Sequence, residues 1–269
     1  MVWKDQAIEL NSVKLSIPKL TGDKLRIAHL KSELQSLLVR NKVKVSAEAS
    51  TQIRLRIGTV KVPAQWKGQE KEAYEIIVAK RGVVITANAV EGLNYGVQTL
   101  RQLMVHKNGK TTVAVCSISD YPAFKIRGFM HDVGRNFQSI DQLKMQIETF
   151  AHYKINTFHF HLTEYHGWRL ESKIYPNLQA DSSFTRKVGK YYTQKEFKDL
   201  VDYCWARNIT VIPEFDIPGH SDAFRKGVGV KNMKDPKALK ALIELFDDLC
   251  SLVPREKMPY VHVGTDEVG

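Results

Sequence analysis

Cysteine is scarce in this sequence of 269 residues, which contains only Cys116, Cys204 and Cys250. An odd number of widely spaced cysteines argues against the disulfide framework that holds many small secreted domains together. Cys204 and Cys250 each fall on the apolar side of an expected helix, so we expect both to be buried free thiols. Long apolar runs are also missing, because no stretch approaches the roughly 18 apolar residues that a membrane span requires.

Signals for export, nucleotides and nucleic acids are missing as well. The first residues, Met-Val-Trp-Lys-Asp-Gln, contain neither the apolar core nor the small-residue cleavage site of a signal peptide. No glycine-rich phosphate loop or Walker motif follows an expected strand, which removes the main support for nucleotide binding, and no cofactor is expected. The net charge is +11, but no basic block is longer than two residues. The charge therefore indicates a basic surface rather than a nucleic-acid partner.

Residues 1–120 have the pattern of a small α+β domain. Leucine residues at helical spacing predict the first helix, and two adjacent strand patterns predict a hairpin. The expected elements are helices over 21–38 and about 94–105, and strands over 53–57, 74–78, 83–86 and 112–115. Asp120-Tyr-Pro122 marks the domain boundary, because proline ends the preceding element.

From Ile126 onward, strands and helices alternate. The expected strands are 126–130, 156–162, 209–215 and 260–263, and the helices between them are 139–153, 193–207 and 235–253. This alternation predicts an α/β fold with a parallel sheet, either open and doubly wound or closed as a (β/α)8 (TIM) barrel. A complete barrel takes about 250 residues, so the four βα units of residues 121–269 amount to the N-terminal half of one.

Titratable side chains follow every one of these strands, whereas the strand interiors are apolar. In a barrel, the carboxyl ends of the strands carry the active site. The groups at the carboxyl ends of the four strands, in turn, are His131, Asp132 and Arg135; His159, His161 and Glu164; Glu214, Asp216 and His220; and His262, Asp266 and Glu267. We expect these groups to line one catalytic cleft.

Two kinds of hydrolysis fit this set of residues. His159 and His161 lie two apart on a strand and point to the same face, as paired zinc ligands do. No third ligand lies at a fixed spacing, so we favour hydrogen bonding inside a polar barrel and assign no metal site. Glycoside hydrolysis instead requires carboxyl groups beside a glycosidic bond. Asp266 and Glu267, directly after a buried strand, fit that requirement, and Trp168 after the second strand is expected to stack on a sugar.

Several motifs occur in order along residues 120–269. They are Arg127-Gly128 with Asp132 and Arg135, Lys154-Ile-Asn-Thr-Phe-His-Phe-His-Leu-Thr163, Gly167-Trp-Arg169, Tyr175-Pro176, Tyr192-Thr193, Ile212-Pro-Glu-Phe-Asp-Ile-Pro-Gly-His220 and His262-Val-Gly-Thr-Asp-Glu-Val268. In this order they resemble the β-N-acetylhexosaminidases of glycoside hydrolase family 20. Tyr74-Glu75 and the segment 92–103 resemble the small α+β domain that precedes the barrel in this family.

The resemblance implies that terminal β-linked N-acetylglucosamine or N-acetylgalactosamine is removed from glycans by a retaining, substrate-assisted mechanism. The 2-acetamido oxygen of the substrate attacks the anomeric carbon and gives an oxazolinium intermediate. The resemblance assigns the general acid/base to Glu267 and the orientation of the acetamido group to Asp266. It also assigns the 3- and 4-hydroxyl groups of the sugar to Arg135, and places His220 in a hydrogen-bonded relay between Glu267 and Glu164.

The sequence departs from the family pattern at three positions. Glu164 stands where aspartate is usual, Asn136 where histidine is usual, and Thr265 where glycine or alanine is usual. A larger departure is the C-terminal half of the barrel, which in the family supplies a tyrosine and the tryptophans of the sugar pocket. We therefore expect a chain of this extent to have little hydrolase activity by itself.

The alternative function is that of a non-catalytic remnant that binds a sugar or a partner chain. Half a barrel has open sheet edges on both sides, so self-association is one expected consequence. Relatives of this type are often exported, which favours a periplasmic or secreted protein, although no signal peptide is visible. The expected partners are glycans that contain N-acetylhexosamine, with no nucleic acid and no membrane span.

Overall fold

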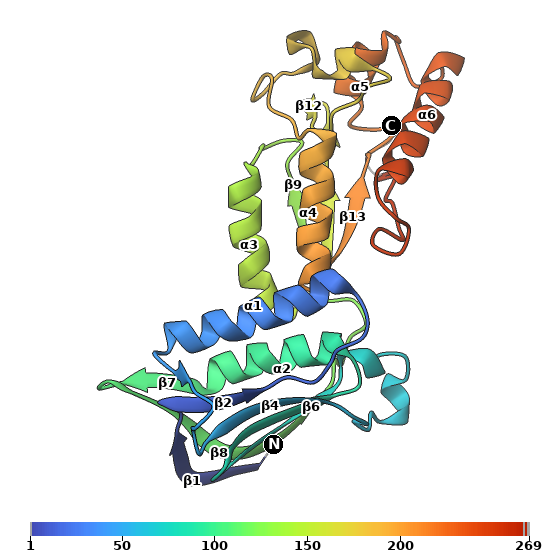
Figure 1. Cartoon of the computed structure of the whole chain (residues 1–269). Helices are drawn as coiled ribbons and strands as arrows, with labels where there is room; N and C mark the ends of the chain where they lie inside the picture. The colour runs from blue at the N-terminus through green and yellow to red at the C-terminus, as the bar shows by residue number, and fades with distance from the viewer. Residues whose placement is uncertain (1, 266, 268–269) are drawn as a thin grey trace. The chain divides into compact units, whose positions relative to one another are not determined.

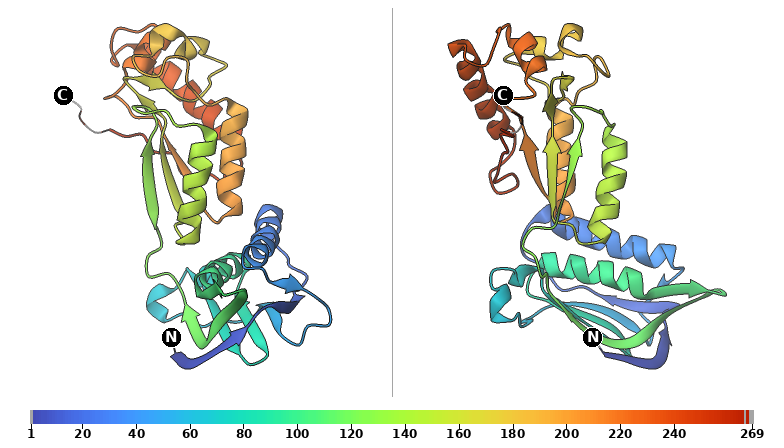
Figure 2. Two further views of the ribbon diagram at one scale, coloured as in Figure 1. Left: turned by 90° about the vertical axis from the view of Figure 1, so that its left-hand side faces the viewer. Right: turned by 180° about the vertical axis from the view of Figure 1, so that it is seen from behind.

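The computed structural model describes residues 2–265 and residue 267, and the chain forms two compact units. The first unit contains the residues up to 125 together with 152–154 and 206–208, and so extends beyond the predicted boundary at residue 120. The second unit contains 126–151, 155–205 and 209–269. Within the described residues, no helix is long and apolar enough to cross a membrane. Figures 1 and 2 show the elements of both units.

The first unit is built on one mixed sheet with the strand order β1-β8-β5-β6-β4-β2-β3, and β7 pairs with β8. Helices α1 (Lys24–Arg40) and α2 (Val90–Leu103) both lie on one face of this sheet (Figure 1). Two short 3-10 helices, η1 (Ala64–Trp66) and η2 (Glu70–Glu72), precede β5. The strands are β1 (Val2–Glu9), β2 (Ser12–Ser16), β3 (Lys44–Val45), β4 (Gln52–Ile57), β5 (Tyr74–Ala79), β6 (Gly82–Ala87), β7 (Met104–Lys107) and β8 (Lys110–Asp120).

Local sequence accounts for the first helix and for the hairpin. The Asp23 carboxylate caps α1 by accepting hydrogen bonds from the backbone N–H groups of Leu25 and Arg26. Strands β5 and β6 pair antiparallel, as predicted. Gly82 at their turn has a φ of +126°, and a Cβ atom there would lie 1.9 Å from the Gln52 carbonyl oxygen. Only glycine fits this position, so the turn is fixed by one residue.

Other elements of the first unit differ from the sequence-based expectation. Helix α2 begins at Val90 rather than near residue 94, because Val90 and Leu93 already pack into the apolar core. The sequence patterns do not predict β1, β2, β3 or β7. Strands β1, β3 and β7 expose most of their described side chains, and β2 buries only Val13 fully, so these strands lack the clear alternation on which strand prediction depends.

The second unit contains a parallel sheet of order β13-β10-β9. Its strands are β9 (Gly128–Asp132), β10 (Thr157–His161) and β13 (Thr210–Glu214). Helices α3 (Ile140–His152), α4 (Gln194–Ala206) and α6 (Pro236–Leu252) alternate with the strands, as predicted, and α3 and α4 pack on one face of the sheet (Figure 2). The shorter elements are β11 (Thr163–Glu164), β12 (Gly167–Trp168), η3 (Pro176–Gln179), η4 (Asp181–Ser183) and α5 (Asp222–Val228). The predicted fold class, part of a (β/α)8 barrel after an α+β domain, is confirmed.

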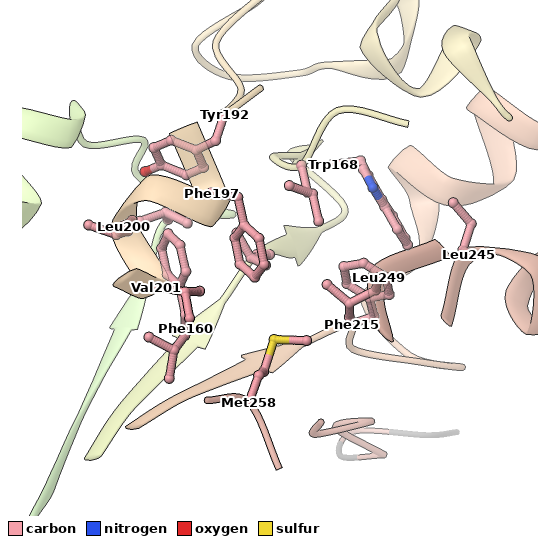
Figure 3. Packing of buried hydrophobic residues seen from close by; sticks show 14 of the residues in the cluster. Phe160, Trp168, Tyr192, Phe197, Leu200, Val201, Phe215, Leu245, Leu249 and Met258 are labelled. Carbon is pink, nitrogen blue, oxygen red and sulfur yellow. The ribbon is translucent and has the colours of Figure 1, made fainter. Parts of the chain in front are cut away.

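The side chains of strand β10 alternate between an apolar face and a polar face of the sheet. Phe158 and Phe160 are fully buried and pack toward the helices, where Phe160 lies beside residues of α4 such as Phe197 (Figure 3). Because side chains alternate along a strand, His159 and His161 point to the opposite face. That face is the interior of the partial barrel.

The parallel register brings the ends of the three strands to the same level. Asp132, the last residue of β9, pairs with His161, the last residue of β10, which in turn pairs with Glu214, the last residue of β13. Three titratable residues from distant parts of the chain therefore become neighbours at one edge of the sheet.

Two predictions about the C-terminal region are wrong. The expected buried strand 260–263 forms only a single bridge, between His262 and Glu214, and Tyr260 and Val263 are 64% and 44% exposed. This segment follows β13 on one side, and within the described residues no strand pairs with its other side. Cys250 is exposed, whereas Cys204 is buried, because the apolar stripe of α6 passes through Leu245 and Leu249 and the next residue turns away from it.

Candidate active site

The carboxyl ends of β9, β10 and β13 carry a cluster of charged side chains in the second unit. Arg135 lies in the turn after β9, held by a hydrogen bond from its own backbone N–H to Asp132 Oδ1 at 2.9 Å. Its guanidinium makes two ion pairs: Nη1 lies 2.5 Å from Asp132 Oδ2, and Nη2 lies 2.6 Å from Glu164 Oε1. The Arg135 side chain remains 42% exposed, so it can contact a ligand while both carboxylates fix its position.

Glu164 is a fully buried carboxylate whose surroundings nevertheless favour the ionised form. Burial alone would raise its pKa, but His161, the backbone N–H of Tyr165, Arg135 and His220 together hold the pKa below its usual range. The Tyr165 N–H donates to Glu164 Oε2 at 2.8 Å, which leaves Oε1 for Arg135 and the two histidine rings. The pKa of Arg135 is raised in turn, because the neighbouring carboxylates outweigh its partial burial.

A relay of three side chains leads from this carboxylate to solvent. Glu164 Oε1 lies 2.8 Å from His220 Nδ1, and His220 Nε2 lies 3.1 Å from Glu267 Oε2. The Glu267 side chain is 77% exposed, whereas Glu164 is completely enclosed. His220 and Glu267 both have left-handed backbone angles, with φ near +50°, which non-glycine residues adopt rarely. The geometry allows a proton to pass between the exposed carboxyl group and the imidazole ring.

A second carboxylate, Glu214, contacts three histidines. Its Oε2 lies 2.6 Å from His159 Nε2 and 3.0 Å from His161 Nδ1, and its Oε1 lies 3.1 Å from His262 Nδ1. Although burial would raise the pKa of Glu214, hydrogen bonds and charges from His159 and His161 hold it far below its usual range. For His161, burial is outweighed by Glu164 and Glu214, and its pKa rises to about 10.

These contacts bear on the possible use of His159 and His161 as metal ligands. His159, Glu214 and His262 have ligand atoms within 4.8 Å of one another, a set whose composition could hold a divalent cation. In this arrangement, however, Glu214 is already the direct partner of each imidazole ring. The interpretation of the histidine pair as part of a hydrogen-bonded polar interior agrees with this geometry.

Asp216 supports the segment that leads to the predicted catalytic pair. It is buried, its backbone N–H donates to Thr163 Oγ1 at 2.9 Å, and its Oδ1 accepts a hydrogen bond from the Thr265 N–H at 3.3 Å. A Cβ atom at Gly264 would lie only 1.8 Å from the same Oδ1. The contact therefore requires glycine at 264. Asp266, predicted as the second catalytic residue, lies outside the described residues.

Trp168 does not face the site. It is 1% exposed, and its ring packs against Phe215 and Phe224, with ring centroids 4.4 and 5.9 Å away (Figure 3). The prediction that it stacks on a sugar is not compatible with this burial, and we give it no role in substrate binding. An aromatic residue after a strand is a weak signal, because core packing uses the same residue types.

Arg169 is a residue that sequence reasoning did not assign. Its guanidinium is fully buried and donates to five carbonyl oxygens. The acceptors are the carbonyl oxygens of Val133 and Gly134, in the turn that leads to Arg135, and of Arg186, Lys187 and Lys190, in the loop that precedes α4. Burial lowers its pKa to about 10. Arg169 thus fixes the turn that presents Arg135.

The partial barrel, with a carboxylate–imidazole–carboxylate relay at its strand ends, defines a fold and site of the glycoside hydrolase type. Comparison of sequences agrees with this class. Residues 124–231 match the model "Glycosyl hydrolase family 20, catalytic domain", and residues 4–121 match "Glycosyl hydrolase family 20, domain 2". The chain therefore belongs to glycoside hydrolase family 20, although Asp266 and Glu267 lie beyond the matched residues.

Individual proteins give the same result. A β-hexosaminidase of Porphyromonas gingivalis is 38% identical over 226 residues, which cover 75% of this chain and 28% of that protein. A β-N-acetylhexosaminidase of Cellulomonas fimi is 34% identical over 73% of this chain and 44% of its own length. The chain thus spans less than half the length of these relatives.

Solved structures extend the similarity to nearly the whole chain. A mutant β-hexosaminidase of Streptomyces plicatus, in complex with N-acetylglucosamine, has a TM-score of 0.83 and 27% identity, and covers 99% of this chain and 57% of that one. The β-N-acetylhexosaminidase of Bacteroides fragilis has a TM-score of 0.82 and 27% identity over the full chain and 56% of its own.

Proposed function

We propose that the chain is the acid/base half of a β-N-acetylhexosaminidase, which acts on glycans with a terminal β-linked N-acetylglucosamine or N-acetylgalactosamine. The observation that supports this most directly is the relay of Glu164, His220 and Glu267, with contacts of 2.8 and 3.1 Å. Such a relay couples an exposed carboxyl group to a buried charge, which suits a residue that must both give and take a proton.

In the proposed reaction the substrate supplies its own nucleophile. The acetamido oxygen forms a bond to the anomeric carbon while the glycosidic C–O bond breaks, and Glu267 gives its proton to the leaving oxygen. Water then attacks the anomeric carbon of the oxazolinium ion and passes a proton back to Glu267, which restores the acetamido group. The β configuration is retained because the anomeric carbon is attacked twice.

Two further side chains orient the sugar in this proposal. Asp266 accepts a hydrogen bond from the acetamido N–H and stabilises the positive charge that develops on the oxazolinium ring. Arg135 binds the 3- and 4-hydroxyl groups, since its guanidinium is partly exposed and both of its carboxylate partners hold it in place.

The test is hydrolysis of 4-nitrophenyl N-acetyl-β-D-glucosaminide by the wild-type chain and by Glu267→Gln, with the exposed Glu256→Gln as the matched control. We expect Glu267→Gln to lower turnover by about 10²- to 10⁴-fold, because general acid–base catalysis contributes a factor of that size. Where turnover of the chain alone is too slow to measure, calorimetry with a thiazoline mimic of the oxazolinium ion replaces it. Equal behaviour of wild type and Glu267→Gln in both assays would contradict the proposal.

A second proposal concerns association with another chain. Within the described residues, β9 pairs with β10 alone, and Met130 on β9 is 52% exposed. An unpaired strand edge is a ready site for pairing with a further strand. We propose that the partial barrel associates with a second copy of this chain, and light scattering after gel filtration should then show a dimer or larger species.

A further inference from the structure

A loop rich in cations lies beside the turn that presents Arg135. The loop spans residues 185–190, Thr-Arg-Lys-Val-Gly-Lys, and every residue in it is exposed. One nitrogen ties the loop to the turn, because Arg169 Nη2 donates to Gly134 O and to Arg186 O, each at 2.9 Å. Since Gly134 directly precedes Arg135, the backbone of Arg186 lies close to that of Arg135.

Specific hydrogen bonds fix the conformation of this loop. Arg169 Nη1 donates to the carbonyl oxygens of Lys187 and Lys190, at 3.1 and 2.9 Å. The hairpin of β11 and β12 holds the start of the loop: the Thr185 N–H donates to His166 O at 3.1 Å, and Thr185 Oγ1 lies 2.9 Å from His166 Nδ1. The loop thus turns three carbonyl groups toward one buried guanidinium and leaves its own cationic side chains in solvent.

These cations have no carboxylate partner. Within the described part of the chain, no ion pair joins Arg186 or either lysine of the loop to an acid, and Arg186 Nη1 donates instead to the neutral Asn136 Oδ1 at 3.5 Å. Arg135, by contrast, has two carboxylate partners. Because Asn136 is the residue after Arg135, the unbalanced positive charge lies next to the arginine that is proposed to bind the sugar.

The neighbouring ring of His166 is affected by the same charges. It is 9% exposed, and its pKa is lowered by burial and then by the charge of Arg186, with Arg135 and Arg169 acting in the same direction. Glu164 opposes this effect without cancelling it. The electrostatics therefore agree with the contacts in making this side of the site positive.

We propose that Arg186 binds a sulfate ester on the 4-oxygen of the terminal N-acetylhexosamine, so that the chain selects 4-sulfated sugars over uncharged ones. The inference rests on the proposed function, in which Arg135 binds the 3- and 4-hydroxyl groups. C-4 is the ring carbon opposite the anomeric carbon, so a substituent there points away from Glu267 and toward the turn of Arg135. A guanidinium without a carboxylate partner can give two parallel N–H groups to an oxyanion, whereas it gains little from a hydroxyl group.

The test compares the affinities of the full chain for N-acetylgalactosamine, its 4-sulfate and its 6-sulfate, measured from chemical-shift changes in nuclear magnetic resonance spectra. We expect wild type to bind the 4-sulfate about fivefold more tightly than the other two sugars, which is the range of an exposed ion pair. Arg186→Gln should reduce this preference to less than about twofold, and Arg186→Lys should retain part of it because the charge remains. Arg255→Gln is the matched control, since Arg255 is also exposed and also forms no ion pair within the described residues.

Three results would overturn the inference: a 4-sulfate that binds no better than the uncharged sugar, a 6-sulfate that binds as well as the 4-sulfate, or a preference that survives in Arg186→Gln. Wild type alone gives a further readout, because higher ionic strength should weaken a preference that depends on an exposed charge. A preference that does not change with salt would overturn the inference as well.

These affinities separate the inference from the proposed function because they need no turnover. A clear preference for the 4-sulfate, together with equal hydrolysis and equal thiazoline binding by wild type and Glu267→Gln, contradicts the proposed function alone. Hydrolysis that is lost in Glu267→Gln, without any preference for the 4-sulfate, contradicts this inference alone. A chain that binds none of the three sugars contradicts both.

Discussion

At the residue scale, Gly264 and Asp216 determine the backbone conformation of the segment that leads to Glu267. Gly264 has a φ of +65°, and its missing side chain leaves room for Asp216 Oδ1, which receives the N–H of Thr265. The next backbone link, His262 N–H to Pro213 O at 2.8 Å, ties the same segment to β13. The segment is therefore held by a few specific contacts rather than by apolar burial.

Gly264→Ala should release this segment from β13. The added Cβ would lie 1.8 Å from Asp216 Oδ1, so the segment must move, and we expect the His262 amide to exchange its hydrogen at least about tenfold faster. Gly109→Ala is the matched control, because Gly109 also has a left-handed φ but a Cβ atom there would meet no other atom within 4 Å. Hydrogen exchange measured by mass spectrometry checks the prediction, and equal protection of His262 in both variants would contradict it.

Glu214→Gln should destabilise the second unit strongly. Glu214 is buried and contacts three imidazole rings, and removal of its charge takes away the closest partner of His161, whose pKa Glu214 helps to raise to about 10. Loss of one member of a buried ion pair costs about 3 kcal/mol or more. We expect a lower urea midpoint for Glu214→Gln and an unchanged one for the exposed Glu256→Gln; a change below about 1 kcal/mol would show that the pair contributes little.

The sequence predicts the residues at the strand ends but not the pairs that they form. Strand alternation places His159 and His161 on one face, and motif order predicts that Glu164 and His220 lie near Glu267. That Glu214 serves three histidines, and that Asp216 supports Gly264, depends on strand register and on side-chain rotamers. Trp168 is misassigned for the same reason, because its burial is produced by Phe215 and Phe224, which lie far from it in sequence.

At the scale of elements, Arg169 fastens one loop to another. It follows β12 directly, and its five acceptors lie in the turn after β9 and in the loop 186–190. Every acceptor is a backbone carbonyl, so the guanidinium is satisfied without a carboxylate partner. The buried Arg169 guanidinium consequently stabilises the turn that carries Arg135.

Arg169→Met should lower both the stability of the second unit and the affinity of the site for its ligand. The change removes the donor from five carbonyl oxygens, and the hydrogen bonds to two of them, Val133 O and Gly134 O, are buried, so we expect a cost of more than about 3 kcal/mol. Affinity for the thiazoline mimic should fall as well, because the Arg135 turn loses its support. Thermal unfolding and calorimetry check both effects, with the exposed Arg255→Met as control; a variant with wild-type stability would contradict the prediction.

The alternating strands and helices of the second half of the chain are predictable because the local sequence of each element marks both its type and its ends. Strands 156–162 and 209–215 and the three helices between residues 139 and 253 each combine a clear period with a turn or a cap. The segment 260–263 has the same composition as a buried strand, yet most of it is exposed, because burial requires neighbours on both sides. The apolar pattern of a segment indicates which side chains can be buried. Whether they are buried depends on how many elements pack beside the segment.

At the scale of the whole molecule, the buried charges make stability depend on pH in two opposite ways. The pKa of Glu164 and of Glu214 is lowered in the folded chain, so their contribution is full above the unfolded value of about 4.3 and is lost as pH falls. The pKa of His161 is raised, so its contribution is full below about 6.5 and is lost as pH rises through about 10.

The chain should therefore be most stable between about pH 4.5 and 6.5 and should lose stability steadily toward pH 10. His161→Gln should remove most of this alkaline decline, because glutamine does not titrate, and should be less stable than wild type at pH 6. The gap between the two proteins should narrow as pH approaches 10, where the wild-type ring gives up its proton. Urea unfolding at pH 6, 8 and 10 measures this, and His106→Gln in the first unit should keep the wild-type slope. Parallel curves for wild type and His161→Gln would mean that His161 is neutral in the folded chain.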